Sequence, residues 1–250
     1  KDREEVSSID YLSLWNSLDN KHYIALESSV AYTKAPFIPK VPERIHKSKL
    51  GAYRFIYMLR NPLTRVESQV RHGLFAGWGK SLDAGIPEDA INYSSYAMQL
   101  DKYLKYFPVD NILIFTLEEF IESPDLVLFR ICQFLNIDSD FKFNNADKTR
   151  NSGEFFNTSA NIARITQSSF GQFIVYNILP KKIKSWLRSF LTNLNKGQKK
   201  TSNLGRWQLT PEERTLVLNR LAEDLKMLES NFGIDIQKYW NIQPDSLNKN

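Results

Sequence analysis

The chain has 250 residues, of which 42% are hydrophobic and 24% are charged, with a net charge of +5. This composition is typical of a globular domain, and the positive balance is compatible with nucleic acid, an anionic membrane surface or a small anionic ligand. The lone cysteine, Cys132, excludes an internal disulfide framework, and the three histidines lack metal-motif spacing, so we expect no metal site.

"YLSLWNSL" (11–18) has apolar residues at helical spacing, and the part of the chain from His22 to Leu74 predicts two strands and two helices. "HYIALES" (22–28) reads as a short strand that ends on Glu27, and "VPERIHK" reads as a helix after a proline-containing loop. "YRFIYMLR" (53–60) is almost continuously apolar, which predicts a strand buried on both faces of a parallel sheet. A helix follows at 62–74, and the segment "LFAGWGKSLDAGIPE" after it predicts a loop or lid over a site.

The second part continues the alternation. "DAINYSSYAMQLDKYLKYF" predicts one long helix, "NILIFTL" a strand, and "SPDLVLFRICQFLNI" a helix with Ser123 as its N-cap. A capping box of Thr210 and Glu213 begins the last helix, and Gly233 ends it. Strands that alternate with helices predict an α/β fold, a three-layer sandwich with a mainly parallel sheet flanked by helices.

We expect a single domain over residues 1–250, with a helical C-terminal portion at about 160–240. No apolar run approaches the roughly 18 residues of a membrane span. The start "KDREEVSSID" is charged and does not resemble a signal peptide. We therefore expect a cytoplasmic protein with no membrane span.

The stretch "FIYMLRNPLTRVESQVRHG" predicts an anion site. Arg60 ends a strand, and ligands of open parallel sheets bind beyond the carboxyl ends of the strands. Asn61 can cap the following helix and Pro62 fits its first turn, which leaves backbone N–H groups for a phosphate. Arg60 and Ser68 together can hold a doubly charged phosphate. On spacing alone, an arginine bound to carbonyls and a solvated serine fit equally well.

The same helix has two distinct faces. Residues three and four positions apart share one side of a helix, so the polar and apolar residues separate. The polar face carries Arg65, Ser68, Gln69 and His72. The face that we expect to pack on the sheet carries Leu63, Val66, Val70 and Leu74.

These residues resemble the 3′-phosphate-binding segment of the sulfotransferase family that uses 3′-phosphoadenosine 5′-phosphosulfate (PAPS). In that family a strand ends in Arg-Asp/Asn-Pro, and a serine follows eight residues after the arginine, so the resemblance implies that Arg60 and Ser68 bind the 3′-phosphate. "ALESSVAYTKAPFIPKVPERI" is similar to the family's "GE-SP-Y" strand and "P-R-I" helix. Segments 95–137 and 209–240 resemble later parts of the domain. The implied fold is the P-loop NTPase-like fold of sulfotransferases.

The resemblance implies transfer of a sulfonate from PAPS to a hydroxyl or amine of a carbohydrate or other small metabolite, without a metal. Adenosine 3′,5′-bisphosphate is the expected product. The family's lysine-containing phosphate loop, which holds the 5′-phosphosulfate, has no match here. We expect this loop, and the usual general base of the carbohydrate branch, to precede Lys1. Within the chain, Glu27 is the candidate base and His72 is a further one.

Other positions have two readings. Lys148 and Arg150 correspond to the family's loop that closes over the nucleotide, although a solvated surface loop fits them equally well. In the "GE-SP-Y" segment Val30 replaces the usual proline, which weakens the transfer of acceptor contacts. Four aromatic residues are candidates for an acceptor cleft or for the core: Phe75, Trp78, Phe155 and Phe156.

Two other classes of function remain open from the sequence. A kinase-like phosphotransferase needs a phosphate loop and carboxylates that hold Mg²⁺. A non-catalytic polyanion binder is supported by the positive charge and by the basic run from Lys196 to Lys200. The chain contains no RNA-recognition signature, so we expect no nucleic-acid partner.

Overall fold

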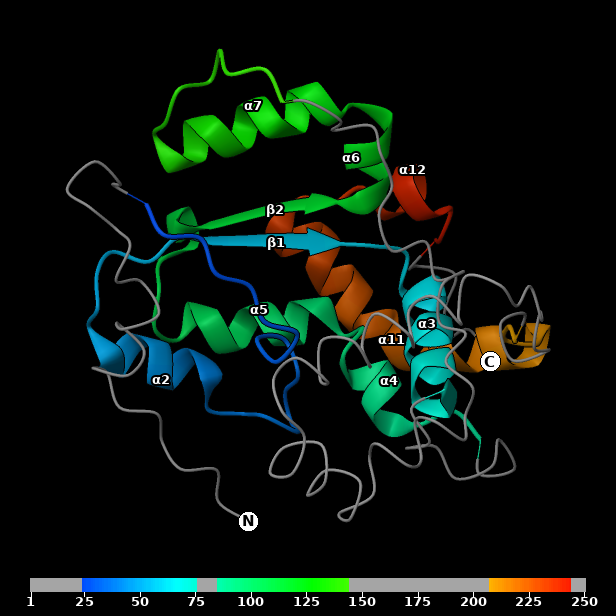
Figure 1. The fold of residues 1–250 in the computed structure, drawn as a ribbon. Coiled ribbons are helices and arrows are strands. Elements are labelled where there is room, and N and C mark those ends of the chain that lie inside the picture. Colours follow the sequence, from blue (N-terminus) through cyan, green and yellow to red (C-terminus); the bar gives the residue numbers. More distant parts are fainter. Residues whose placement is uncertain (1–23, 76–84, 144–206, 244–250) are drawn as a thin grey trace, which may run out of the picture.

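The computed structural model describes residues 24–75, 85–143 and 207–243 (Figure 1). No helix in these ranges is long and apolar enough to cross a membrane. The helices and strands, in chain order, are α2 (Val41–Ser48), β1 (Phe55–Leu59), α3 (Pro62–Phe75), α4 (Glu88–Asn92), α5 (Tyr96–Leu104), the 3₁₀ helix η2 (Val109–Asn111), β2 (Ile112–Thr116), α6 (Leu117–Glu122), α7 (Pro124–Leu135), α11 (Pro211–Phe232) and α12 (Ile236–Trp240).

The two described strands form a parallel pair. Phe55 lies beside Ile112, and Leu59 lies beside Thr116, so both strands end at the same edge of the sheet. Figure 1 shows the pair between α7 on one side and α5 on the other, with α11 crossing behind. The predicted α/β fold, with helices on both sides of a parallel sheet, is confirmed.

The main core lies between the sheet and helices α5 and α11. Leu59, Leu100 and Leu225 are almost completely buried in one cluster, and Tyr57 and Ile114 pack against it. Alternate residues of a strand point to opposite sides of its sheet, so Tyr57 and Leu59 face this core together. Full burial of each leucine contributes about 1.5–3 kcal/mol. The core therefore fixes the orientation of β1, whose end carries the anion-site residues.

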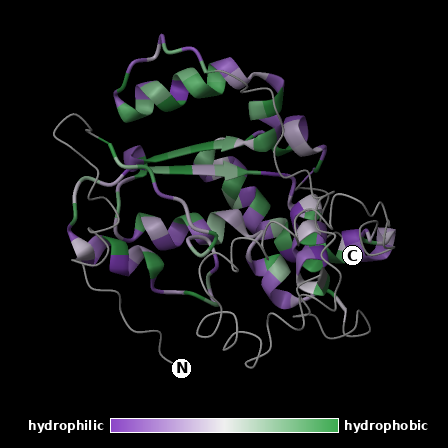
Figure 2. Ribbon diagram, viewed as in Figure 1, coloured by the Kyte–Doolittle hydropathy of each residue, from purple (hydrophilic) through white to green (hydrophobic). Residues whose placement is uncertain are grey.

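The prediction that β1 is buried on both faces is wrong. Figure 2 shows both strands as almost entirely hydrophobic, yet Ile56 is 38% exposed and Met58 is 50% exposed. On this face α7 covers β2, where Phe115, the neighbour of Met58 in the register, is buried. The apolar sequence of β1 thus reports its strand propensity, but not which of its faces has a covering helix.

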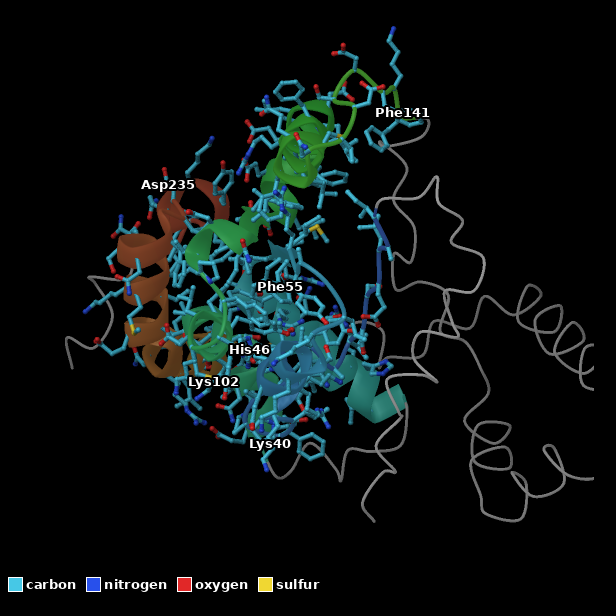
Figure 3. All side chains as sticks on the ribbon, turned by 90° about the vertical axis from the view of Figure 1, so that its left-hand side faces the viewer. Lys40, His46, Phe55, Lys102, Phe141 and Asp235 are labelled. Carbon is cyan, nitrogen blue, oxygen red and sulfur yellow. The ribbon has the colours of Figure 1, made fainter. Side chains whose placement is uncertain are left out.

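An aromatic cluster fixes the beginning of β1. The ring of Phe55 lies 5.0 Å from that of Tyr103 and 4.7 Å from that of Phe107, measured between centroids. His46 of α2 lies 5.7 Å from Phe107 in an edge-on arrangement. Figure 3, in which His46 and Phe55 are labelled, shows the side chains of this region. Such pairs contribute about 0.5–1.5 kcal/mol beyond their buried area. His46 therefore belongs to a packing cluster that joins α2 and α5 to the strand.

The strand predicted at 22–28 is not formed by its described part. From Ile24 to Ser29 the backbone has no regular structure, and Leu26 is 69% exposed. In the described sheet β1 and β2 pair only with each other, so this segment gains no ladder of hydrogen bonds. Glu27 consequently lies in an exposed, irregular segment and not at the end of a strand.

The helix predicted at 89–107 is divided into α4 and α5. The division falls at Tyr93–Ser95, where the hydroxyls of Ser94 and Ser95 donate to the carbonyls of Ala90 and Ile91 at 3.0 and 3.3 Å. Serine hydroxyls compete in this way with the backbone for its hydrogen bonds and favour helix ends. The apolar spacing continues across the break, so periodicity alone predicted one helix.

A distant carboxylate starts α5. Asp224 of α11 accepts hydrogen bonds from the backbone N–H groups of Ala97 at 3.1 Å and Met98 at 2.8 Å. These are N–H groups of the first helical turn, which have no partner within the helix. Asp224 thus acts as a cap supplied by another helix, and it joins α5 to α11.

The two predicted N-caps differ in the structure. Thr210 Oγ1 accepts from the N–H of Glu213 at 3.2 Å, and the Glu213 carboxylate accepts from the N–H of Thr210 at 2.8 Å, which confirms the capping box. Gly233 ends α11 in the left-handed conformation at φ 68°. Ser123 occupies the N-cap position of α7, but its side chain makes no capping hydrogen bond.

This difference gives a stability prediction. We expect Thr210→Ala to lower the free energy of unfolding by about 1 kcal/mol, since it removes a capping bond. Ser123→Ala removes none and should change the free energy by less than about 0.5 kcal/mol. Urea denaturation of both variants measures this. Equal losses in the two variants would contradict the assignment of the caps.

Candidate functional site

Arg60 follows β1 at the carboxyl edge of the sheet, as predicted. Its Nε and Nη2 atoms donate to Thr64 Oγ1 at 3.3 and 3.1 Å, and Nη2 also donates to the Thr64 carbonyl at 3.2 Å. Partial burial lowers the pKa of Arg60 below its usual value, although an arginine stays protonated in proteins. The first turn of α3 therefore holds a charged guanidinium in one orientation. Its Nη1 atom makes no hydrogen bond to the described residues.

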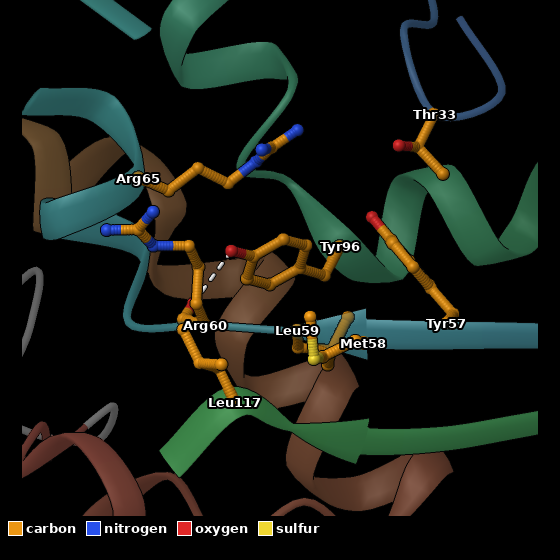
Figure 4. Close-up of a pocket in the computed structure, with 8 residues that line it drawn as sticks. All are labelled: Thr33, Tyr57, Met58, Leu59, Arg60, Arg65, Tyr96 and Leu117. Carbon is orange, nitrogen blue, oxygen red and sulfur yellow. Dashed lines mark hydrogen bonds between the residues drawn. The ribbon is translucent and has the colours of Figure 1, made fainter. Parts of the chain in front are cut away.

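The backbone of Arg60 is fixed from α5. The buried hydroxyl of Tyr96 donates to the carbonyl of Arg60 at 2.7 Å (Figure 4). Burial raises the pKa of Tyr96, so this hydroxyl remains a donor at neutral pH. Sequence reasoning missed Tyr96, because no local pattern indicates which carbonyl a distant tyrosine will bind.

Asn61 caps α3, which confirms the predicted cap but removes the predicted N–H donors. Its Oδ1 accepts from the N–H groups of Leu63 at 3.0 Å and Thr64 at 3.4 Å. The N–H of Asn61 itself donates to Glu118 Oε1 at 3.0 Å, and Pro62 has no N–H. All first-turn N–H groups expected to be available for a phosphate thus have partners or do not exist. An anion at this edge has to be bound by side chains.

Glu118 joins three elements behind Arg60. In addition to the N–H of Asn61, it accepts at Oε2 from the indole N–H of Trp240 at 3.0 Å. Both carboxylate oxygens therefore have partners, from the start of α3 and from α12. The sequence shows a glutamate just after a strand, but it does not predict α12, which is too short for a periodic pattern.

The two faces of α3 are largely as predicted. Leu63, Val66 and Val70 are buried, and Ser68 is half-buried on the other side. Ser68 makes no hydrogen bond to the described residues, and His72 is exposed near the end of the helix. Phe75 is the last residue of α3.

Glu67, next to Ser68, is a buried carboxylate that sequence reasoning missed. It is 4% exposed, and it accepts from Arg214 Nη2 at 2.8 Å and from the N–H of Leu209 at 3.3 Å. A buried carboxylate requires such partners. In the sequence, only its position beside the apolar Val66 indicates that Glu67 is buried. Glu67 fixes the middle of α3, and therefore Ser68, against α11.

A pocket of about 240 Å³ lies between the end of β1, α3 and α5 (Figure 4). Arg65 reaches it from α3, and its Nε donates to the carbonyl of Tyr93 at 3.0 Å. The pocket contains two guanidinium groups and no carboxylate among its lining residues. Those residues are Thr33, Tyr57, Met58, Leu59, Arg60, Arg65, Tyr96 and Leu117.

The two tyrosines of this pocket differ in their hydrogen bonds. Tyr96 has a partner, whereas the buried hydroxyl of Tyr57 has none within the described residues. We expect Tyr96→Phe to lower the free energy of unfolding by about 1–3 kcal/mol, since it leaves the Arg60 carbonyl unpaired. Tyr57→Phe should leave stability unchanged or raise it slightly. Thermal denaturation of both variants measures the contrast, and a large loss in Tyr57→Phe would contradict it.

The predicted site residues are only partly placed. Arg60 lines the pocket, Ser68 does not, and Glu27 is exposed. Desolvation of the Glu27 carboxyl raises its pKa. The other predicted positions lie outside the described residues: Trp78, Lys148, Arg150, Phe155, Phe156 and Lys196–Lys200. Within residues 24–75, 85–143 and 207–243, no group of His, Cys, Asp and Glu is arranged to hold a metal ion. Cys132 is buried, as expected from its apolar surroundings.

Comparison with known proteins agrees with this architecture. A family model described as "Sulfotransferase domain" matches residues 20–194, which is more than half of the chain. The fold is similar to the crystal structure of a sulfotransferase from Alicyclobacillus acidocaldarius, with a TM-score of 0.57 and 16% sequence identity. That match covers 93% of this chain and 74% of the other. At this identity, the structural likeness shows a common fold.

Proposed function

Because the chain belongs to the sulfotransferase domain family, we propose that it transfers a sulfonate group from PAPS to a hydroxyl or amine of an acceptor. The acceptor we propose is a carbohydrate or another small metabolite. The observation that carries the proposal is the position of Arg60. A charged guanidinium is held at the carboxyl edge of a parallel sheet, where α/β proteins bind their ligands, beside a pocket lined by no carboxylate.

The 3′-phosphate of the donor is the proposed ligand of Arg60 and Ser68. Arg60 is already oriented by Thr64, so little side-chain entropy is lost when an anion binds. Ser68 presents a half-buried hydroxyl on α3, the helix that follows Arg60. Lys148 and Arg150 are proposed to close over the nucleotide. Charged donors of this kind form strong hydrogen bonds with phosphate oxygens.

The proposed reaction is an in-line transfer. The acceptor oxygen or nitrogen attacks sulfur, the bond between sulfur and the bridging phosphate oxygen breaks, and adenosine 3′,5′-bisphosphate leaves. The acceptor proton goes to a base, for which Glu27 is the candidate in this chain. Desolvation raises the pKa of the Glu27 carboxyl, which is the direction that favours proton transfer near neutral pH. The protein contributes positioning and cationic stabilisation of the leaving group.

Calorimetry with adenosine 3′,5′-bisphosphate tests this function. We expect saturable binding of one molecule per chain, without added metal, and transfer of labelled sulfonate from PAPS to sugar acceptors. ATP serves as the competing nucleotide, because it lacks a 3′-phosphate. Absence of binding, or transfer of phosphate from ATP, would overturn the proposal.

A further inference from the structure

The pocket beside Arg60 contains a second guanidinium, that of Arg65. Arg60 and Arg65 both line it, and the charge of Arg65 contributes to lowering the pKa of Arg60. Glu118, which also acts on the charge of Arg60, already has both oxygens occupied by Asn61 and Trp240. Two like charges at one partly buried pocket without a carboxylate in its lining favour the binding of an anion.

The hydroxyl of Tyr57 is a second, independent sign of a ligand. It is buried and has no hydrogen-bond partner within the described residues. The neighbouring Thr33 side chain partly offsets the effect of burial on the pKa of Tyr57. Figure 4 shows it pointing into the pocket, on the side where Arg65 ends. Burial raises the pKa of Tyr57 to about 12, so the group is a donor at neutral pH. Buried donors without partners are rare in proteins unless something else binds them.

Arg65 is held in a position to share a ligand with Tyr57. Its Nε donates to the carbonyl of Tyr93, which directs the side chain across the pocket (Figure 4). Both terminal amino groups of Arg65 make no hydrogen bond to the described residues. A guanidinium fixed through Nε and open at its two amino groups is suited to bind two oxygens of one anion.

We propose that Arg65 and Tyr57, together with the Thr33 hydroxyl, form a second oxyanion subsite beside Arg60, which binds a sulfonate or sulfate group. The volume of about 240 Å³ is below the roughly 300–1,000 Å³ typical of sites for whole drug-sized ligands. The subsite therefore holds one group of a larger molecule. The identity of that group rests on the proposed function: it is the sulfonate of the donor, or a sulfate already present on the acceptor.

Calorimetric titration with inorganic sulfate tests the subsite directly. We expect sulfate to bind the protein both alone and after saturation with adenosine 3′,5′-bisphosphate. Tyr57→Phe and Arg65→Gln should each weaken sulfate binding about tenfold, the effect of one hydrogen bond to a charged group. Binding of adenosine 3′,5′-bisphosphate to Tyr57→Phe should stay within about twofold of wild type, since the subsite does not bind the 3′-phosphate. Unchanged sulfate binding by Tyr57→Phe would overturn the proposal.

The matched control is Arg71→Gln. This change removes the same charge from the same helix, and Arg71 also donates to one backbone carbonyl, that of Trp207 at 3.1 Å, but it does not line the pocket. Sulfate should bind Arg71→Gln nearly as tightly as wild type. An equal loss of sulfate affinity in Arg65→Gln and Arg71→Gln would show that only the net charge of the protein matters. That result would contradict the subsite. Tyr57→Phe keeps the charge of the pocket, and we expect it to retain the fold. Its melting temperature checks this.

PAPS then distinguishes the two sources of the group. Weaker binding of PAPS, but not of adenosine 3′,5′-bisphosphate, by Tyr57→Phe assigns the subsite to the donor sulfonate. If Tyr57→Phe weakens the binding of sulfate but not that of PAPS, the subsite binds a sulfate group of the acceptor. Both results support the subsite. If sulfate binds through Tyr57 while adenosine 3′,5′-bisphosphate does not bind at all, the subsite stands and the proposed function fails.

Discussion

Arg60→Ala is expected to weaken the binding of adenosine 3′,5′-bisphosphate on the order of 100-fold. The change removes a guanidinium that Thr64 already orients. A hydrogen bond to a charged group contributes about 1.5–3 kcal/mol, and each 1.4 kcal/mol corresponds to about a tenfold change in affinity. Calorimetry on wild type and variant measures it. Binding should also weaken with added salt in the wild type, because the contact is ionic.

Arg54→Ala is the matched control for this experiment. Arg54 precedes β1 at its opposite end, where its guanidinium lies 5.4 Å from the centre of the Phe134 ring. Arg54→Ala removes the same charge as Arg60→Ala, but at the other end of β1. We expect a change of less than about threefold, since screening weakens a charge at that distance. Wild-type affinity in Arg60→Ala would show that the 3′-phosphate is bound elsewhere.

The connection from β1 to α3 could be predicted because its determinants are local. Asn61 and Pro62 specify the beginning of the helix through residues two and three positions away, and the buried face repeats at helical spacing. The hydrogen bonds that make this connection rigid are not local. Asn61 binds Glu118, and the Arg60 carbonyl binds Tyr96, across 57 and 36 positions of the sequence. No spacing rule identifies such partners.

Two wrong predictions have the same physical origin. The helix at 89–107 was expected to be continuous because its apolar spacing is continuous, but Ser94 and Ser95 bind carbonyls of the preceding turn. The strand at 22–28 was expected from its apolar residues, but the described sheet gives it no partner. In both segments the local preference competes with hydrogen bonds that only the folded chain determines.

The polar residues of the pocket show the limit of a motif. The resemblance to sulfotransferases implies a role for Arg60 and Ser68, which lie eight residues apart in one segment. It gave no role to Tyr57 or Arg65, although Tyr57 lies three residues before Arg60. An apolar strand pattern predicts a tyrosine to be core, and only the folded structure shows that its hydroxyl lacks a partner within the described residues. Burial without a partner is the signal that sequence cannot show.

Asp224→Ala should give the largest loss of stability, about 2–4 kcal/mol at acidic pH. The change removes the acceptor for the N–H groups of Ala97 and Met98, and each buried donor left unpaired costs about 1–3 kcal/mol. It also removes a polar link between α5, which carries Tyr96, and α11. Urea denaturation measures the loss, with Asp110→Ala, at an exposed position, as a control that should change by less than about 0.5 kcal/mol.

The pH dependence of this loss follows from the pKa of Asp224. Desolvation by burial raises its pKa in the folded protein, more than the hydrogen bonds from Met98, Ala97 and Tyr96 lower it. The folded state thus binds the proton more tightly than the unfolded state. The stability that Asp224 supplies is therefore complete below its unfolded pKa, near 3.8, and decreases as the pH rises through its folded pKa. The difference in unfolding free energy between wild type and Asp224→Ala should decline over this window and then level off. A difference that grows with rising pH would show that the capping bonds, and not burial, dominate the pKa of this carboxylate.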